Sequence, residues 1–192
     1  EGGLKLSRQQ GAQMNALLDN PDLKWHGADT LQELNRKLRD FEGIKKVDAP
    51  KGLQAELRDY QRQGLSWLQF LRDYDFNGIL ADDMGLGTTV QTLAYFLLEK
   101  ESGRRLQPSL VIVPTRLVSN WAREARIFAP ALNVLIMHGS DRHDRVEHIA
   151  SHDVIITTYP LLRRDSEILQ EQDFYTIVLD ESQFIKNPKS KT

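Results

Sequence analysis

The chain has 192 residues, of which 40% are hydrophobic and 27% are charged, and its formal net charge is -2. These values are typical of a folded globular protein and exclude a globally basic surface, so any contact with nucleic acid would need a local patch. The absence of cysteine excludes disulfides and cysteine-ligated zinc, and no apolar run is long enough to cross a bilayer. We therefore expect a cytoplasmic protein without a membrane partner.

The first 50 residues predict a small helical segment and a linker. Ser7 can cap a helix that runs to about Leu18, where Asn20 and Pro21 end it. A second helix is predicted from about residue 29 to 41, with its leucines on one face. Residues 47–53 contain a proline and a glycine and predict a linker. We expect a domain boundary here, with residues 1–50 as one part and residues 51–192 as the main domain.

After this boundary, short β-branched runs alternate with helical patterns. The predicted helices cover residues 57–74, 89–99, 117–128, 141–150 and 161–169, and the predicted strands cover residues 78–81, 110–113, 134–137, 154–157 and 176–179. Alternating strands and helices indicate βα units, which build a mostly parallel sheet with helices on both faces. The predicted fold class is therefore α/β. In such sheets, ligands bind at the carboxyl ends of the strands.

A glycine-rich turn joins the first predicted strand to the helix at residues 89–99. This order of strand, turn and helix is typical of a phosphate-binding loop, where backbone N–H groups and the helix dipole hold the phosphates. The expected nucleotide-binding residues are Asp83, Met84, Gly85, Leu86, Gly87, Thr88, Thr89 and Val90. The hydroxyl of Thr89 is expected to ligate Mg²⁺.

Thr88 stands where this motif normally has a lysine. A threonine hydroxyl has no charge and is too short to reach between the β- and γ-phosphates. The loss of one preorganised donor to a transition state typically lowers the rate by about 10²–10³. We therefore predict that this chain binds nucleotide weakly and hydrolyses it poorly or not at all.

The last predicted strand ends in two acids, Asp180 and Glu181. An apolar strand followed by Asp-Glu suits a nucleotide hydrolase, in which Asp180 would hold Mg²⁺ and Glu181 would position and deprotonate the attacking water. Two acids at a strand end can also be merely solvated. Their combination with the glycine-rich turn about 90 residues earlier, in one βα chain, favours the catalytic interpretation.

Five segments in a fixed order resemble the motifs of one family. They are residues 57–68, 82–89, 110–121, 153–159 and 180–188. Together they resemble the first RecA-like lobe of a SWI/SNF-type DNA-dependent ATPase of helicase superfamily two, of the bacterial kind. The family's phosphate-loop motif usually reads Asp-Glu-Met-Gly-Leu-Gly-Lys-Thr, so Thr88 is the main departure.

The resemblance implies a RecA-like fold that binds ATP and Mg²⁺ between two lobes and moves along double-stranded DNA, with a DNA-bound protein as a further possible partner. It assigns Gln61 to the adenine base and places Thr115, Arg116, Thr157 and Thr158 on the DNA side. The family's next motif and its second lobe with an arginine finger do not occur in the 192 residues. We therefore expect a fragment that folds but does not turn over ATP.

Two other interpretations remain open. The chain could be a non-catalytic nucleotide- or DNA-binding module, which Thr88 favours and the intact Asp180, Glu181 and Gln61 disfavour. It could also be an unrelated phosphate-loop enzyme such as a small kinase. That alternative would not account for the segments around Gln61, Trp121 and Thr157.

Overall fold

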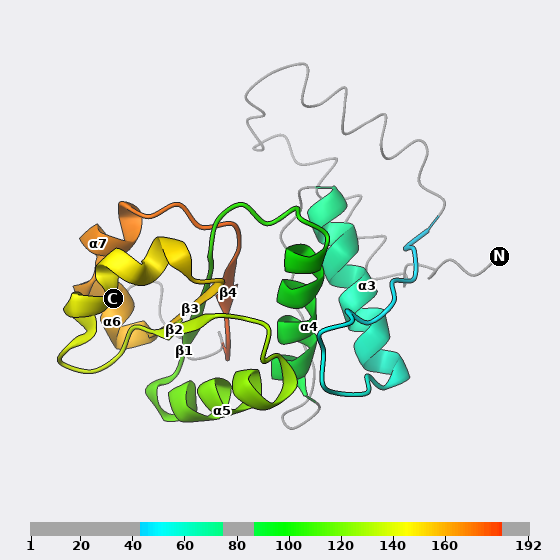
Figure 1. Ribbon diagram of the computed structural model, residues 1–192, viewed down its shortest axis with the longest axis horizontal. Helices are drawn as coiled ribbons and strands as arrows, with labels where there is room; N and C mark the ends of the chain where they lie inside the picture. The colour runs from blue at the N-terminus through cyan, green and yellow to red at the C-terminus, as the bar shows by residue number, and fades with distance from the viewer. Residues whose placement is uncertain (1–42, 75–86, 182–192) are drawn as a thin grey trace, which may run out of the picture. The chain divides into compact units, whose positions relative to one another are not determined.

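The computed structural model describes residues 43–74 and 87–181 (Figure 1). The chain divides into two compact units, one made of Glu1–Asp48 with Arg58–Leu86 and the other of Ala49–Leu57 with Gly87–Thr192. The two helices predicted before residue 42 and the strand predicted at residues 78–81 lie outside the described residues. The predicted boundary at residue 50 therefore stays a prediction.

The described part of the first unit is built around α3, Asp59–Asp73. The helix begins with a local cap, because the side-chain oxygen of Gln61 accepts the backbone N–H of Arg58 at 2.9 Å. Phe70 and Leu71 are buried on one face and form a small cluster with Ile44. The helix predicted at residues 57–74 is therefore confirmed, although its buried residues include the polar side chains of Gln61, Ser66 and Gln69.

The second unit contains a four-stranded, all-parallel sheet with strand order β2-β3-β1-β4. The strands are β1 Ser109–Val113, β2 Val134–Ile136, β3 Val154–Thr158 and β4 Ile177–Leu179. Every residue of β1 and β3 is buried, which agrees with their central position and their nearly continuous β-branched sequence. The α/β fold class with a parallel sheet is therefore confirmed.

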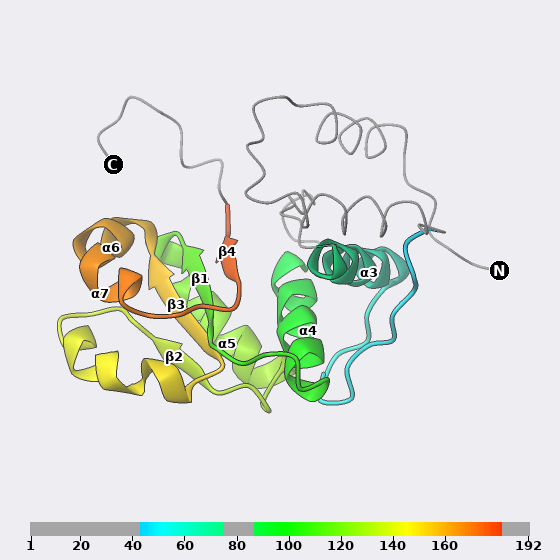
Figure 2. The ribbon, with the colours of Figure 1, turned by 90° about the horizontal axis from the view of Figure 1, so that it is seen from above.

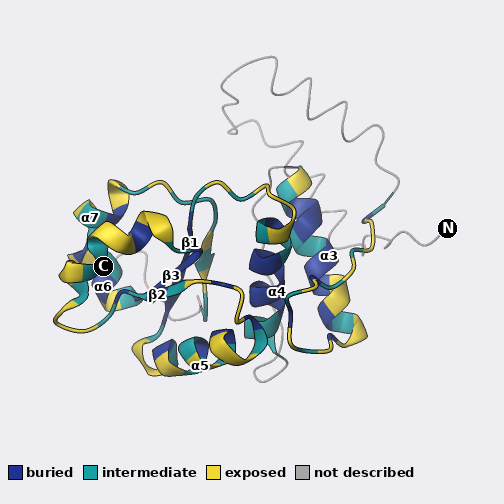
Figure 3. Cartoon of the chain, viewed as in Figure 1, coloured by how far each residue is buried: buried dark blue, intermediate teal, exposed yellow. Residues whose placement is uncertain are grey.

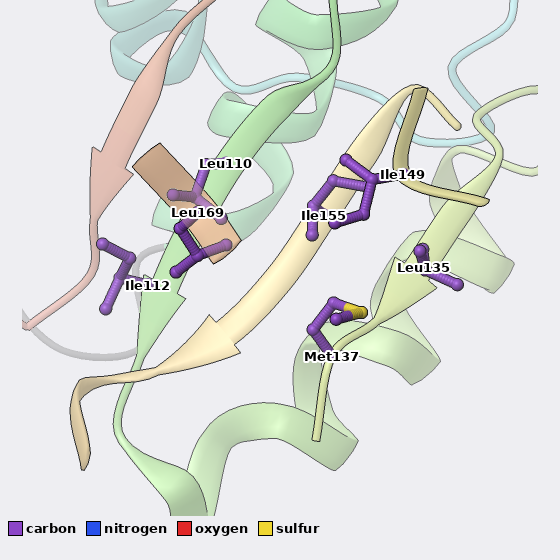
Figure 4. Packing of buried hydrophobic residues seen from close by; sticks show 7 residues of the cluster. All are labelled: Leu110, Ile112, Leu135, Met137, Ile149, Ile155 and Leu169. Atoms are coloured by element: carbon purple, nitrogen blue, oxygen red, sulfur yellow. The ribbon is translucent and has the colours of Figure 1, made fainter. Parts of the chain in front are cut away.

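Helices cover both faces of this sheet (Figure 2). They are α4 Thr88–Glu101, α5 Val118–Phe128, α6 Tyr159–Arg164 and α7 Ser166–Gln170, together with the 3₁₀ segments η1 Thr115–Leu117 and η2 Arg142–Ser151. The buried side chains of β1, β2 and β3 on one face meet residues of η2 and α7 (Figure 4). This cluster consists of Leu110, Ile112, Leu135, Met137, Ile149, Ile155 and Leu169. Figure 3 shows buried residues in dark blue along β1, β3 and α4.

Ion pairs and hydrogen bonds surround Asp153 at the end of the sheet where β3 begins. The carboxylate of Asp153 is only 5% exposed and accepts hydrogen bonds from Lys100 Nζ at 2.8 Å and the Asn133 backbone N–H at 2.7 Å. Arg105 forms a further ion pair with Asp153. These contacts satisfy a buried charge, which would otherwise be costly.

Two predicted helices differ from the structure. Residues 142–151 form 3₁₀ turns instead of the predicted α-helix, and residues 161–169 are divided between α6 and α7. The division falls at Asp165, whose side chain is 4% exposed and accepts two hydrogen bonds from Arg142, at 2.7 and 3.0 Å. A buried ion pair between η2 and the α6–α7 junction therefore overrides the helical periodicity of both segments.

The described helices include none that is both long enough and apolar enough to cross a membrane.

Candidate functional site

The N-terminus of α4 and the carboxyl end of β4 lie at the same edge of the second unit (Figure 2). All four strands of the sheet are parallel, so their carboxyl ends also meet at this edge. The crevice outside these ends is the usual ligand site of an open α/β sheet. The structure thus brings the described end of the glycine-rich turn to the same edge as the Asp-Glu pair.

Gly87 is the residue before α4, and its φ of 81° lies in the left-handed region. Glycine adopts this conformation without the steric cost that a Cβ atom would bring. Thr88 and Thr89 begin the helix, whose first backbone N–H groups have no partner within the helix. The first turn contains no acidic residue, so its dipole favours an anion such as a phosphate. Asp83, Met84, Gly85 and Leu86 lie outside the described residues.

Asp180 forms hydrogen bonds with residues of three different elements. Its backbone N–H donates to Ile112 O of β1 at 2.9 Å, which extends the sheet by one residue. The indole Nε1–H of Trp121 on α5 donates to Asp180 Oδ2 at 2.8 Å. The hydroxyl of Tyr159 on α6 donates to Asp180 O at 2.7 Å. The carboxylate therefore has a fixed direction, and its Oδ1 accepts no hydrogen bond from the described residues.

Tyr159 is buried enough to remain neutral over a wide pH range. Burial, together with the nearby negative charges of Asp180 and Glu181, raises the pKa of Tyr159 to about 12. The phenol consequently keeps its proton at neutral pH and remains a hydrogen-bond donor to the backbone of Asp180.

Glu181 has a backbone φ of 48°, which is uncommon for a residue other than glycine. Its carboxylate forms an ion pair with Arg116 of η1. The Glu181 side chain is 15% exposed, whereas that of Arg116 is 57% exposed. The structure thus joins two residues that the sequence assigned to different tasks, one to the attacking water and the other to DNA.

The four residues predicted to face DNA have different environments. Thr115 and Arg116 are exposed on the short turn after β1. Thr157 and Thr158 are each only 1% exposed because they belong to β3, one of the two central strands. Their side chains therefore lie below the surface at this edge.

Gln61 belongs to the other compact unit and is 7% exposed. Its side chain caps α3 through the backbone of Arg58. The predicted adenine contact of Gln61 is not tested by this arrangement.

The sequence motifs include Trp121 and Tyr159, but the sequence assigned neither residue a contact with Asp180. Trp121 lies in the apolar stripe of α5 with Val118 and Ala125, so its position predicts an ordinary core residue. A buried tryptophan usually needs an acceptor for its indole N–H. This requirement is the one sequence signal that Trp121 has a polar partner. Nothing local in the sequence indicated that the acceptor lies 59 residues away.

The described residues contain no group of three or more histidine, cysteine or acidic side chains that could enclose a metal ion. A magnesium ion bound with a nucleotide does not need such a cage, because phosphates and water supply most of its ligands. One carboxylate with an unengaged oxygen and one helix N-terminal hydroxyl are enough on the protein side. Asp180 and Thr89 fit that donor set.

A family model matches a stretch of the chain that begins within α3 and runs to the last residue. Residues 60–192 match the family model described as SNF2-related domain.

Curated relatives carry names from the same group of proteins. The "Putative ATP-dependent helicase/translocase YwqA" of Bacillus subtilis is 44% identical over 164 residues, which cover 84% of this chain and 18% of that protein. "Helicase SWR1" of Eremothecium gossypii is 37% identical over 194 residues, covering 95% of this chain and 12% of that protein. The chain thus spans less than a fifth of the length of either relative.

A solved structure also resembles the chain. The "Sulfolobus solfataricus SWI2/SNF2 ATPase core in complex with dsDNA" superposes with a TM-score of 0.70 at 41% sequence identity. The match covers 77% of this chain and 30% of that one. It agrees with the RecA-like architecture that the sequence motifs predicted.

Proposed function

The chain belongs to the SNF2-related domain family, and from this premise we propose that it is the ATP-binding lobe of a DNA-dependent ATPase. The longer protein would move along double-stranded DNA or remodel protein bound to it. The names of the relatives, which include an ATP-dependent helicase/translocase, support this proposal. The similar solved structure supports it as well, because that protein is an ATPase core in complex with dsDNA.

One observation carries the proposal: the carboxylate of Asp180 is fixed by Trp121 at the edge where α4 begins. We propose that Asp180 and Thr89 hold Mg²⁺, which would neutralise phosphate charge during hydrolysis. The backbone of residues 83–90 would bind the phosphates, and Gln61 would contact the adenine. Glu181 would orient the attacking water and take its proton.

DNA would approach the exposed turn after β1. Thr115 and Arg116 are the predicted DNA-side residues that are exposed, and an arginine can bind a backbone phosphate with two hydrogen bonds. Because Thr157 and Thr158 are buried, we propose no direct DNA contact for their side chains. A second lobe in the same longer protein would complete the site from the other side, and a cytoplasmic location remains our expectation.

Thr88 would leave this lobe with impaired hydrolysis. The residue occupies the first turn of α4 with a neutral side chain in place of a lysine. The loss of that charge removes a donor to the transferred phosphoryl group, while the helix N-terminus still attracts phosphate. Binding is thus expected to be affected less than turnover.

A non-catalytic module is the second candidate, and Thr88 is the observation that favours it. Calorimetry with Mg-ATP separates the two candidates when the chain with Thr88 is compared with its Thr88→Lys variant, each joined to the second lobe. A motor lobe should gain both affinity and DNA-stimulated hydrolysis from the lysine. Nucleotide binding that improves without any hydrolysis would support the module instead.

A further inference from the structure

Arg116 connects the exposed turn after β1 with the carboxylate that follows β4. Its guanidinium pairs with Glu181, 65 residues further along the chain. Arg116 is 57% exposed, so a ligand at the surface can reach the same guanidinium, whereas Glu181 is only 15% exposed. The ion pair therefore connects the exposed guanidinium of Arg116 with the more enclosed carboxylate of Glu181.

The ion pair fixes the direction of the Glu181 side chain. A carboxylate oxygen that accepts a hydrogen bond from a guanidinium is turned toward the η1 turn. The left-handed backbone of Glu181, with φ of 48°, further limits the directions that its side chain can take. A general base must lie within hydrogen-bond reach of the water that it deprotonates. Arg116 and the attacking water therefore compete for the carboxylate of Glu181.

A DNA phosphate is a strong competitor for Arg116. Guanidinium–phosphate pairs are often bidentate, and their geometry matches the planar fork of arginine. Ion pairs with an exposed partner are weak, so a phosphate can compete with Glu181 for the guanidinium. Thr115, which is also exposed, lies beside Arg116 on the same turn.

We propose that Arg116 is a positioning residue that restrains Glu181 in the absence of DNA and releases it when the guanidinium binds a DNA phosphate. This inference rests on the proposed function, because it assigns a regulatory task to the same site. It gives a direct physical route by which DNA stimulates hydrolysis. By thermodynamic linkage, the restraint must also weaken DNA binding, since Glu181 and the phosphate compete for one group.

DNA binding without nucleotide tests this competition independently of turnover. Anisotropy with a short labelled duplex should show that Glu181→Gln raises the affinity of the two-lobe protein about two- to fivefold, the range expected for an exposed ion pair. The same substitution in an Arg116→Ala protein should have no effect. Glu167→Gln, which removes one exposed charge on α7, is the matched control for net charge.

The salt dependence of binding gives a second readout. Arg116→Ala should reduce the slope of log affinity against log salt by about 0.9, the loss of one phosphate contact, and Arg126→Ala on α5 should not. The inference is overturned if Glu181→Gln changes affinity equally with and without Arg116, or no more than Glu167→Gln does.

Hydrolysis tests the consequence for the reaction. In a Thr88→Lys background, Arg116→Ala should raise the DNA-free rate about two- to fivefold, the range expected for release of an exposed ion pair, and reduce the stimulation by DNA. Arg116→Lys should restore part of the stimulation, because it keeps the charge but loses the bidentate fork. Unchanged stimulation in Arg116→Ala would refute the inference and leave the proposed function standing. A complete lack of hydrolysis in Thr88→Lys would instead refute the proposed function.

Discussion

The indole N–H of Trp121 and the carboxylate of Asp180 form a 2.8 Å hydrogen bond between α5 and the end of β4. This bond converts a buried core tryptophan into part of the candidate metal site. It leaves the other carboxylate oxygen of Asp180 for a ligand and fixes the direction from which that ligand must approach. The side chain of Trp121 therefore both packs in the core and orients a residue of the candidate site.

Trp121→Phe should weaken both the fold and the binding of Mg-nucleotide. The substitution removes a hydrogen bond to a charged group, worth about 1.5–3 kcal/mol, from a side chain that is 2% exposed. Urea unfolding measures the first effect and calorimetry with and without Mg²⁺ the second. Trp67→Phe in the other unit is the control for loss of an indole and should leave the Mg²⁺ dependence of nucleotide binding unchanged. Equal Mg²⁺ dependence in both variants would argue against a role for Trp121 in orienting Asp180.

Gly87→Ala should destabilise the chain by about 1–2 kcal/mol, because an L-residue at φ of 81° is strained. It should also reduce nucleotide affinity, since Gly87 begins the helix that receives the phosphates. Gly103→Ala provides a matched control, with a similar φ of 72° and no atom within 4 Å of the added Cβ. A similar loss of stability is expected there without any loss of affinity. If Gly103→Ala weakened nucleotide binding as much, the effect would be one of general stability.

Asp165→Asn should destabilise the second unit at neutral pH and much less in acid. The hydrogen bonds from Arg142 are the largest cause that holds the pKa of Asp165 below its usual value; burial opposes them, and the contact with His143 lowers the pKa further. A depressed pKa means that this stabilisation is present above the ordinary value of 3.8 and is lost as the pH falls through the lower folded value.

Urea unfolding of Asp165→Asn and the unsubstituted chain between neutral pH and about pH 2 measures this difference. Asp173→Asn, at an exposed position, should show little difference at any pH. If the two proteins differed in stability by the same amount at neutral pH and in strong acid, the lowered pKa of Asp165 would be contradicted.

Tyr159→Phe should make the free energy of unfolding less dependent on pH under alkaline conditions. Burial is the largest cause that raises the pKa of Tyr159 to about 12, above its ordinary value of 10.0. A raised pKa means that the contribution of the neutral phenol is fully present below about pH 10 and is lost as the pH rises toward 12. Unfolding free energies measured from about pH 8 to 12 should therefore fall less steeply for Tyr159→Phe than for the unsubstituted chain. Identical slopes would show that Tyr159 is not buried against Asp180 as described.

The sequence predicted most of the parallel sheet, because short apolar, β-branched runs such as Leu110–Val113 are typical of strands that are buried on both faces. It also predicted that Asp180 and Glu181 follow the last strand. It could not predict that Asp165 would divide a helix, because the reason is an ion pair with Arg142, 23 residues earlier. The pairing of Arg116 with Glu181 depends in the same way on strand order, which no local pattern encodes.

DNA-stimulated ATP hydrolysis by the Thr88→Lys variant, in the longer protein that contains both lobes, tests the central claim most directly. The restored lysine supplies one charged donor to the transferred phosphoryl group, so the rate should rise by at least about 10² over the protein with Thr88. Double-stranded DNA should increase that rate further. No gain in hydrolysis from the lysine, with or without DNA, would contradict the assignment of this chain as the ATP-binding lobe of a DNA-dependent motor.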